Sequence, residues 1–188
     1  MRRMLRTAPL LVAVAVLTSS CGYNTLQGLD EQVNKAQGQI EVQLQRRADL
    51  IPNLVETVKG YAKQEETIFT AVAEARAGLI GAVQGGNVGQ MATANDAMTG
   101  ALGRLLAISE AYPALKSDQN FLRLQDELAG TENRIAVSRT DYNNAVRDYN
   151  AYIRKFPAVL TAKVTGAKPQ EYFEVTNAAA NAVPAVKF

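Results

Sequence analysis

A seven-residue repeat of apolar and aromatic side chains constrains the fold of this chain more than any other feature. One position in each heptad holds Phe121, Leu128, Ile135, Tyr142, Tyr149 and Phe156. Because side chains seven residues apart return to the same face of a helix, the repeat predicts one long helix packed along its length. Ser117 and Asp118 suit its start. Its end is expected at Phe156, since Pro157 disfavours helical geometry in the residue before it.

A second stripe with helical spacing runs through the first half of the chain. Its positions lie three or four residues apart and are apolar apart from one arginine and one glutamate: Leu26, Leu29, Val33, Ala36, Ile40, Leu44, Arg47, Ile51, Leu54, Val58, Tyr61, Glu65, Ile68, Val72, Ala75 and Leu79. The phase survives Pro52, which favours a kinked helix, whereas the segment lengths match one another better if the chain breaks there. The sequence predicts an all-α fold, an elongated antiparallel bundle of three to four long helices, and leaves the kink or break at Pro52 open.

Turn signals separate the predicted helices. The Gly85-Gly86 pair should end one helix. Asn87 with Gln90 resembles a capping box, which would open a shorter helix that runs through Leu106. Tyr112-Pro113 marks the next corner.

The sequence changes character after the predicted bundle, residues 25–157. The C-terminal extension, residues 158–188, contains a linker at 165–169 and an aromatic pair, Tyr172-Phe173, that we expect to pack on the bundle. The tail from Asn177 onward is rich in Ala and Asn and is expected to be extended or disordered.

The N-terminus has the pattern of an export signal. Basic residues precede an apolar run, Ala8 to Leu17, of about ten residues, which is shorter than the roughly 20 that cross a bilayer as a helix. Cys21, the only cysteine, follows small residues. We expect a signal peptide at 1–20, acylation of Cys21 after cleavage, and a lipid-anchored N-terminus at 21–24. The alternatives are an ordinary secretory signal and an uncleaved N-terminal helix.

This signal predicts a cell-envelope protein, anchored to a membrane on its exported, periplasmic side, with inner or outer membrane left open. Loss of the signal removes Arg2, Arg3 and Arg6 from the 20 Lys and Arg residues, which leaves 17 against 18 Asp and Glu. No basic excess then remains to neutralise phosphates. Nucleic-acid binding is therefore not expected.

One segment of the chain carries a family resemblance. Residues Leu44–Tyr61, LQRRADLIPNLVETVKGY, resemble the signature segment of the LemA family. Further pieces agree in the same order: EAYPALK at 110–116, TENRI at 131–135 and VPAVKF at 183–188. The resemblance implies an all-helical envelope protein, tethered near its N-terminus, with no agreed molecular function. Members often carry one transmembrane helix where this chain has its cysteine signal.

The residue types exclude several kinds of catalytic site. The chain has no histidine, so Ser-His-Asp and Cys-His catalysis and the Glu-x-x-His pairs of di-iron bundles cannot occur. Gly85-Gly86 lacks the lysine and hydroxyl of a phosphate-binding loop. We expect no metal and no cofactor. The predicted function is a non-enzymatic interaction or scaffold module for another envelope protein. The alternative is an envelope protein-maturation factor with its own hydrolytic activity, and the oligomeric state is left open.

Six polar residues are candidates for buried polar sites. Arg47 and Glu65 fall on the apolar stripe, where a charge must be paired or reach solvent. This placement fits either a structural salt bridge or a recognition site in a groove. Tyr142-Asn143 and Tyr149-Asn150 repeat the same dipeptide seven residues apart. This repeat fits either a hydrogen-bonded rib between helices or a ligand site.

Four apolar residues around Pro52 form the candidate interaction surface: Leu50, Ile51, Leu54 and Val55. Together with Val58 they cover more of a helix circumference than one core-facing stripe requires. Pro52 also frees backbone groups among them. We therefore expect a protein partner to pack on this segment.

Overall fold

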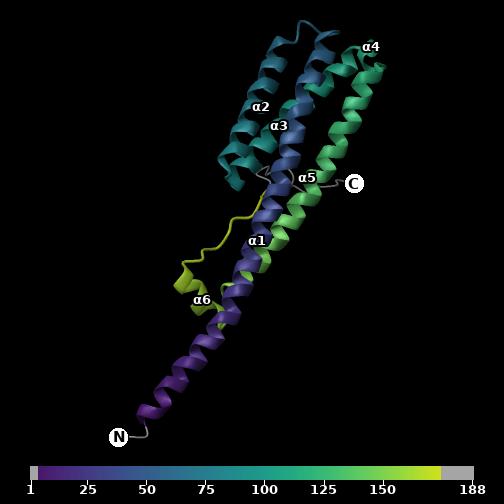
Figure 1. The fold of residues 1–188 in the computed structure, drawn as a ribbon. Helices are drawn as coiled ribbons and strands as arrows, with labels where there is room; N and C mark the ends of the chain where they lie inside the picture. The colour runs from purple at the N-terminus through teal and green to yellow at the C-terminus, as the bar shows by residue number, and fades with distance from the viewer. Residues whose placement is uncertain (1–3, 175–188) are drawn as a thin grey trace, which may run out of the picture. The chain divides into compact units, whose positions relative to one another are not determined.

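The computed structural model of the chain describes the backbone of residues 4–174 and the side chains of residues 22–174. The described chain contains six helices and no strand, which confirms the all-α prediction (Figure 1). The helices are α1 (Met4–Lys59), α2 (Glu66–Gly85), α3 (Val88–Ala111), α4 (Pro113–Lys116), α5 (Gln119–Tyr152) and α6 (Ala158–Thr165). Within this part of the chain, no helix combines the length and the apolar character that crossing a membrane requires.

The chain divides into two compact units. Of the described residues, the first unit contains 4–37 and 141–171, and the second contains 38–140 and 172–174. Since α1 and α5 are long, each contributes one part to each unit. The predicted lipidation at Cys21 and the predicted tail from Asn177 concern side chains outside those that the structure describes.

The second unit is a bundle of four long helical segments, and α2 and α3 form its most local pair. They lie side by side and antiparallel, joined through Gly86 and Asn87 (Figure 1). Gly86 adopts φ 66°, which is the left-handed geometry that commonly ends helices. The Asn87 side chain accepts a 2.8 Å hydrogen bond from the backbone nitrogen of Gln90 and caps α3. The turn predicted from these residues is confirmed.

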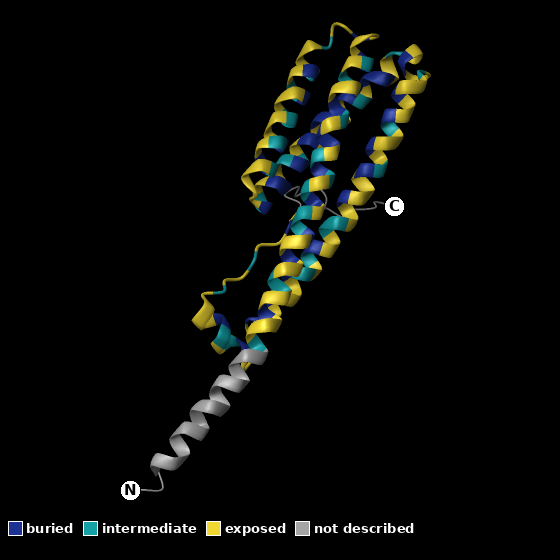
Figure 2. Ribbon diagram, in the orientation of Figure 1, coloured by how far each residue is buried: buried dark blue, intermediate teal, exposed yellow. Residues whose placement is uncertain are grey.

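The core of the second unit follows the predicted apolar spacing in most places, and Figure 2 shows buried residues recurring along the helices. The fully buried large side chains come from all four long helices: Ile40, Leu44, Ile51, Leu54, Leu79, Met91, Met98, Leu105 and Phe121. Burial of this apolar surface is the main contribution that holds the segments together.

Pro52 neither splits nor ends α1, and the break in the stripe through the first half of the chain lies elsewhere. α1 continues to Lys59, and residues 60–65 connect it to α2. Within α2, Val72 and Leu79 are buried as the stripe predicted, whereas Phe69 is buried in place of Ile68. The connection itself is not helical, so the stripe does not continue through it. The predictions that place Tyr61 and Glu65 on a continuing stripe are therefore wrong. Tyr61 is exposed, and Glu65 is half-buried at the N-terminal boundary of α2.

The first unit combines one part each of α1 and α5 with α6 and an extended segment, residues 167–171. Its buried side chains include Leu26 and Val33 of α1 and Tyr142, Val146 and Tyr149 of α5. α5 ends at Tyr152, earlier than predicted, and Phe156 is exposed rather than buried. A turn at residues 153–157 leads into α6, a helix that the apolar spacing did not predict.

The end of α6 and the segment beyond it agree in part with the predicted linker. Gly166 has φ 71°, and the nitrogen of Ala167 donates to the oxygen of Ala162, 2.9 Å away, which closes the helix. Beyond this point Phe173 is buried, whereas Tyr172 is exposed. Only one member of the predicted aromatic pair is therefore packed against the protein.

Candidate functional site

Arg47 is a buried cation that connects three helices of the second unit. Its Nη1 donates to Asn95 Oδ1 of α3 at 2.6 Å and lies 2.8 Å from Glu132 Oε2 of α5. Its Nη2 donates to Thr99 Oγ1 at 3.0 Å. The Thr99 hydroxyl in turn donates to the backbone oxygen of Asn95 at 3.0 Å, which orients the hydroxyl as an acceptor for the guanidinium. α1, α3 and α5 are thus fixed to one another through a single side chain.

The surroundings of Arg47 balance the cost of burying its charge only in part. Desolvation lowers the pKa of the Arg47 guanidinium, while the nearby carboxylates of Glu132 and Asp96 raise it. The Glu132 side chain is about half exposed, so the ion pair lies at the edge of the core. A buried arginine held by directed hydrogen bonds has a structural role, because it fixes the helices that supply its partners.

The two Tyr-Asn dipeptides lie in the first unit, and two of their side chains hold the extended segment. The Tyr142 hydroxyl donates to the backbone oxygen of Glu171 at 2.9 Å. Asn150 Nδ2 donates to the oxygen of Gln170 at 2.9 Å, and Asn150 Oδ1 accepts from the nitrogen of Gln170 at 2.8 Å. Asn150 therefore satisfies both backbone groups of one residue, as a neighbouring strand would.

The other two members of these dipeptides have different environments. Tyr149 is buried, and its pKa is raised by burial and by the nearby carboxylate of Asp30. Asn143 is half-buried. Burial and the charge of Glu171 raise the pKa of Tyr142 to about 12. Where the sequence analysis considered hydrogen bonds between helices, Tyr142 and Asn150 instead hold the backbone of residues 170–171. We call this arrangement the clasp.

A further polar contact links the beginning of the α1–α2 connection to the residue before α5. The Tyr61 hydroxyl donates to Asp118 Oδ2 at 2.9 Å, and Asp118 Oδ1 accepts from the nitrogen of Phe121 at 2.9 Å. Asp118 therefore caps α5, as predicted, and its pKa is lowered first by the hydrogen bond from Phe121 and then by that from Tyr61. Sequence reasoning missed the contact with Tyr61, because the two residues are 57 positions apart and no local signal links them.

The four residues of the candidate interaction surface do not share one exposure. Ile51 and Leu54 are buried in the core, which excludes them from an exposed surface. The reason is that α1 passes through Pro52 without changing phase, so both residues stay on the face of Leu44. Leu50 and Val55 are half-buried.

A groove lies on the second unit beside Leu50, and we call it the α1 groove. It has a volume of about 710 Å³ and is lined by Gly38, Val42, Arg46, Asp49, Leu50 and Val83, among others. Val42 is 62% exposed, although large apolar side chains are more often covered. The sequence analysis missed Val42 because it lies off the apolar stripe. Its only signal is an apolar residue among polar neighbours on the outer face of a helix.

The described side chains contain no group of three or more His, Cys, Asp or Glu residues that could hold a metal ion. The acidic residues discussed above instead serve as a cap, at Asp118, and as an ion-pair partner, at Glu132.

Comparison with known proteins agrees with the resemblance carried by Leu44–Tyr61. A model described as LemA family matches residues 36–188, which is most of the chain. This chain belongs to the LemA family. Among its LemA-type relatives is magnetosome protein MamQ 2 of Paramagnetospirillum magneticum, which is 31% identical over 188 residues covering 88% of this chain and 69% of the relative. Magnetosome protein MamQ of Magnetospirillum gryphiswaldense is 29% identical over 193 residues, with 90% and 71% covered.

Proposed function

We propose that this LemA-family chain is a membrane-anchored interaction module of the cell envelope, without catalytic activity of its own. The observation that carries the proposal is the α1 groove, an apolar depression with Val42 exposed at its surface. Large exposed apolar groups rimmed by polar residues are typical of protein interaction sites. The buried arginine that could have formed a recognition site is instead occupied by Asn95, Thr99 and Glu132.

The proposed occupant of the α1 groove is an amphipathic helix of another envelope protein. Val42, Leu50 and Val83 supply an apolar centre. The exposed Arg46 and Asp49 lie at the rim and offer one charge of each sign. A helix with a narrow apolar stripe between charged positions matches this arrangement.

Membrane attachment through Cys21 is part of the proposal. It is supported by the short apolar run and the small residues before the cysteine. The two relatives above carry the name magnetosome protein, which is consistent with a role at a cellular structure but assigns no activity. Cys21→Ser should move the exported protein from the membrane fraction to the soluble fraction. Retention of this variant in salt-washed membranes would instead indicate an uncleaved N-terminal helix.

Site-specific crosslinking in intact cells tests the groove. A photo-reactive amino acid at Val42 should give one discrete adduct, while the same amino acid at Val137 of α5, which is 61% exposed, should not. Leu50→Lys should remove the Val42 adduct without changing the melting temperature, because it places a charge in the apolar centre. The crosslinked peptide of the partner should be an amphipathic helix.

Two outcomes would count against this function. Equal adducts at Val42 and Val137, or an adduct that survives Leu50→Lys in a folded protein, would exclude the α1 groove as the contact. Cleavage of an envelope substrate by the purified chain, lost with a serine or lysine substitution and unaffected by Leu50→Lys, would favour the hydrolytic maturation factor instead.

A further inference from the structure

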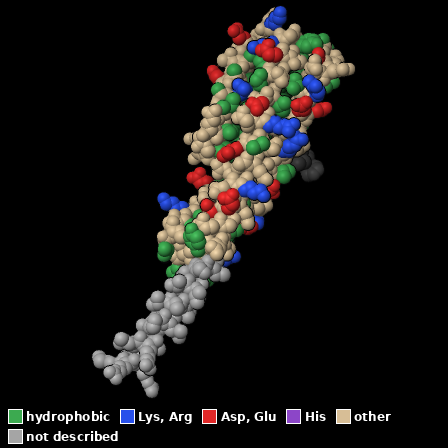
Figure 3. All heavy atoms as spheres, viewed as in Figure 1, with side chains coloured by type: hydrophobic (Ala, Val, Ile, Leu, Met, Phe, Trp, Pro, Cys, Tyr) green, Lys and Arg blue, Asp and Glu red, His purple; other side chains and the backbone are tan. Residues whose placement is uncertain are grey.

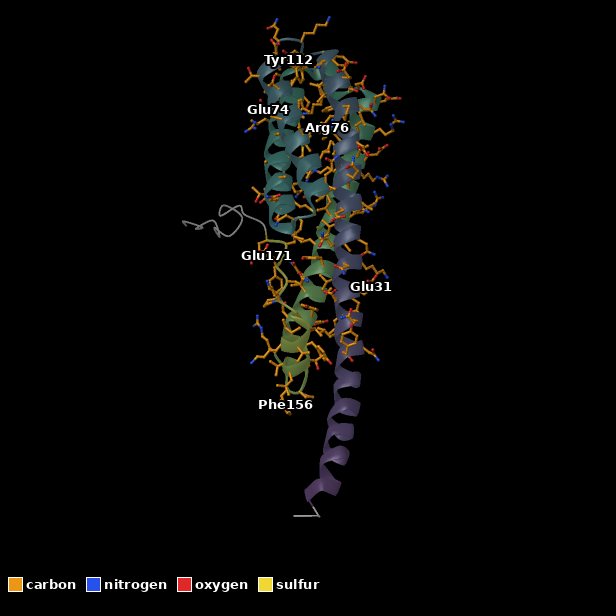
Figure 4. The ribbon with its side chains drawn as sticks, turned by 60° about the vertical axis from the view of Figure 1, so that its left-hand side comes forward. Glu31, Glu74, Arg76, Tyr112, Phe156 and Glu171 are labelled. Carbon is orange, nitrogen blue, oxygen red and sulfur yellow. The ribbon has the colours of Figure 1, made fainter. Side chains whose placement is uncertain are left out.

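A second groove, the α6 groove, lies within the first unit between residues 22–25 of α1 and helix α6. It has a volume of about 590 Å³, and its lining includes Gly22, Tyr23, Lys155, Phe156, Leu160 and Val164. Figure 4 labels Phe156 at the turn that joins α5 to α6. The proposed interaction with a protein partner does not involve this groove.

Helix α6 buries its small residues and exposes its large apolar ones, which is the reverse of the usual pattern for a helix on the surface of a soluble protein. Its small residues Ala158 and Ala162 face the protein and are buried. Phe156, Leu160 and Val164 follow at intervals of four residues and are 82%, 56% and 88% exposed. This interval places Leu160 and Val164 on one side of α6. Phe156 lies in the turn before the helix and lines the same groove. A surface helix that exposes its large apolar residues and buries its alanines is suited to an apolar environment outside the protein.

The charged residues within the sequence segment that carries this apolar row have one sign. From Tyr149 to Gln170 the chain contains Arg154, Lys155, Lys163 and Lys168 and no acidic residue. Figure 3 shows hydrophobic and basic side chains on the surface over α6, with acidic side chains on the neighbouring surface. Basic side chains beside exposed apolar residues match the anionic headgroups and the acyl region of a bilayer surface.

The N-terminal segment of the chain leads into the same groove. The Tyr152 hydroxyl donates to the backbone oxygen of Gly22 at 3.2 Å. A Cβ atom at Gly22 would lie 3.2 Å from Thr161 Oγ1 of α6, so the backbone there approaches α6 closely. Cys21 is the next residue towards the N-terminus. A lipid on Cys21, or an uncleaved membrane helix ending there, would bring the bilayer to α6.

We propose that the exposed row Phe156, Leu160 and Val164 inserts into the surface of an anionic lipid bilayer as a second membrane contact. Attachment through a lipid is strengthened when a second apolar or basic contact reaches the same bilayer. This inference rests on the membrane anchor proposed above for the orientation of the chain. Lipid binding by α6 itself can be measured without that anchor.

The absence of tryptophan from the chain permits a direct test. In a Cys21→Ser chain, Phe156→Trp provides one reporter, and Val137→Trp on α5 provides the matched control. With vesicles of phosphatidylcholine and phosphatidylglycerol, the emission of the Phe156→Trp reporter should shift to shorter wavelength and be quenched by brominated lipid. The Val137→Trp reporter should not respond, and vesicles of phosphatidylcholine alone should give a weaker response at position 156.

Sedimentation with vesicles supplies the second measurement. The double variant Leu160→Gln and Val164→Gln should lower the bound fraction by about tenfold, as expected when two apolar groups are removed from an interfacial contact. Both side chains are exposed, so the melting temperature should not fall. Equal vesicle binding by this variant and its parent, or a Phe156→Trp signal that responds to protein concentration and not to lipid, would overturn the proposal. Membrane retention of Cys21→Ser in cells would count against the lipid anchor as the sole attachment, and the vesicle measurements separately decide the contact through α6.

Discussion

Arg76 Nε donates a 2.9 Å hydrogen bond to the backbone oxygen of Ala48. Ala48 lies four residues before Pro52, so its oxygen would accept from residue 52 if that residue carried an N–H. Proline cannot supply this donor, and the guanidinium of Arg76, labelled on α2 in Figure 4, replaces it. The contact explains how α1 continues through Pro52 without leaving a polar group unsatisfied.

The first prediction tests this replacement with a double-mutant cycle. Arg76→Met keeps much of the aliphatic length and removes the donor, so it should lower the free energy of unfolding by about 1–2 kcal/mol. The loss should be smaller when Pro52→Ala is present, because an alanine at position 52 can donate its own N–H to the Ala48 oxygen within the helix. Urea denaturation of the four proteins measures both values. The same loss in both backgrounds would show that Arg76 acts elsewhere.

A second prediction concerns the buried guanidinium of Arg47 and its ion-pair partner Glu132. Arg47→Met leaves the buried Asn95 amide oxygen without its donor and should cost about 1–3 kcal/mol. Glu132→Gln should cost less than about 1 kcal/mol, because the carboxylate is half exposed and its attraction is screened by solvent. Chemical denaturation at neutral pH compares the variants. A larger loss from Glu132→Gln would mean that the ion pair, and not the hydrogen bonds, dominates.

The third prediction follows from the clasp around residues 170–171. The pKa of Tyr142 is raised, so the folded state favours its protonated form. The stability from this group is complete below the ordinary value of 10.0 and is lost as the pH rises through about 12. Tyr142→Phe should remove the highest step from a spectrophotometric titration of the tyrosines. It should also increase protease cleavage near Glu171, and an unchanged titration would contradict the assignment.

The last prediction tests the phase of α5. Ile135 is buried and its neighbour Arg134 is exposed. Ile135→Asp would bury an unpaired charge and should largely unfold the protein, while Arg134→Asp should change stability by less than about 0.5 kcal/mol. Circular dichroism and thermal melting distinguish the two. Similar melting losses would indicate a different register for the helix.

The sequence predicted the elements whose packing depends on spacing alone. Five members of the heptad series, from Phe121 to Tyr149, are buried because helical geometry repeats regardless of what packs against it. Phe156 follows the same spacing but lies beyond the end of α5 at Tyr152. A repeat cannot reveal where its helix stops.

The features that sequence reasoning missed depend on residues far apart in the chain. Nothing in the local sequence distinguishes Arg76 from other exposed arginines on a helix, so the substitute donor for Ala48 could not be foreseen. The sequence signals at Pro52 therefore leave a kink or a break open, and they predict a surface that includes Ile51 and Leu54. α6 was missed for another reason, since its apolar residues face outward and its buried residues are alanines.

The two-residue connection between α2 and α3 sets an order for assembly of the core. The contacts of this hairpin close short loops, whereas Arg76 reaches Ala48 across 28 positions, Tyr61 reaches Asp118 across 57, and Tyr152 reaches Gly22 across 130. Contacts between distant positions form more slowly because longer loops must close. The α2–α3 hairpin is therefore expected to form early, and the contact of α5 with the N-terminal part of α1, between Tyr152 and Gly22, should form last.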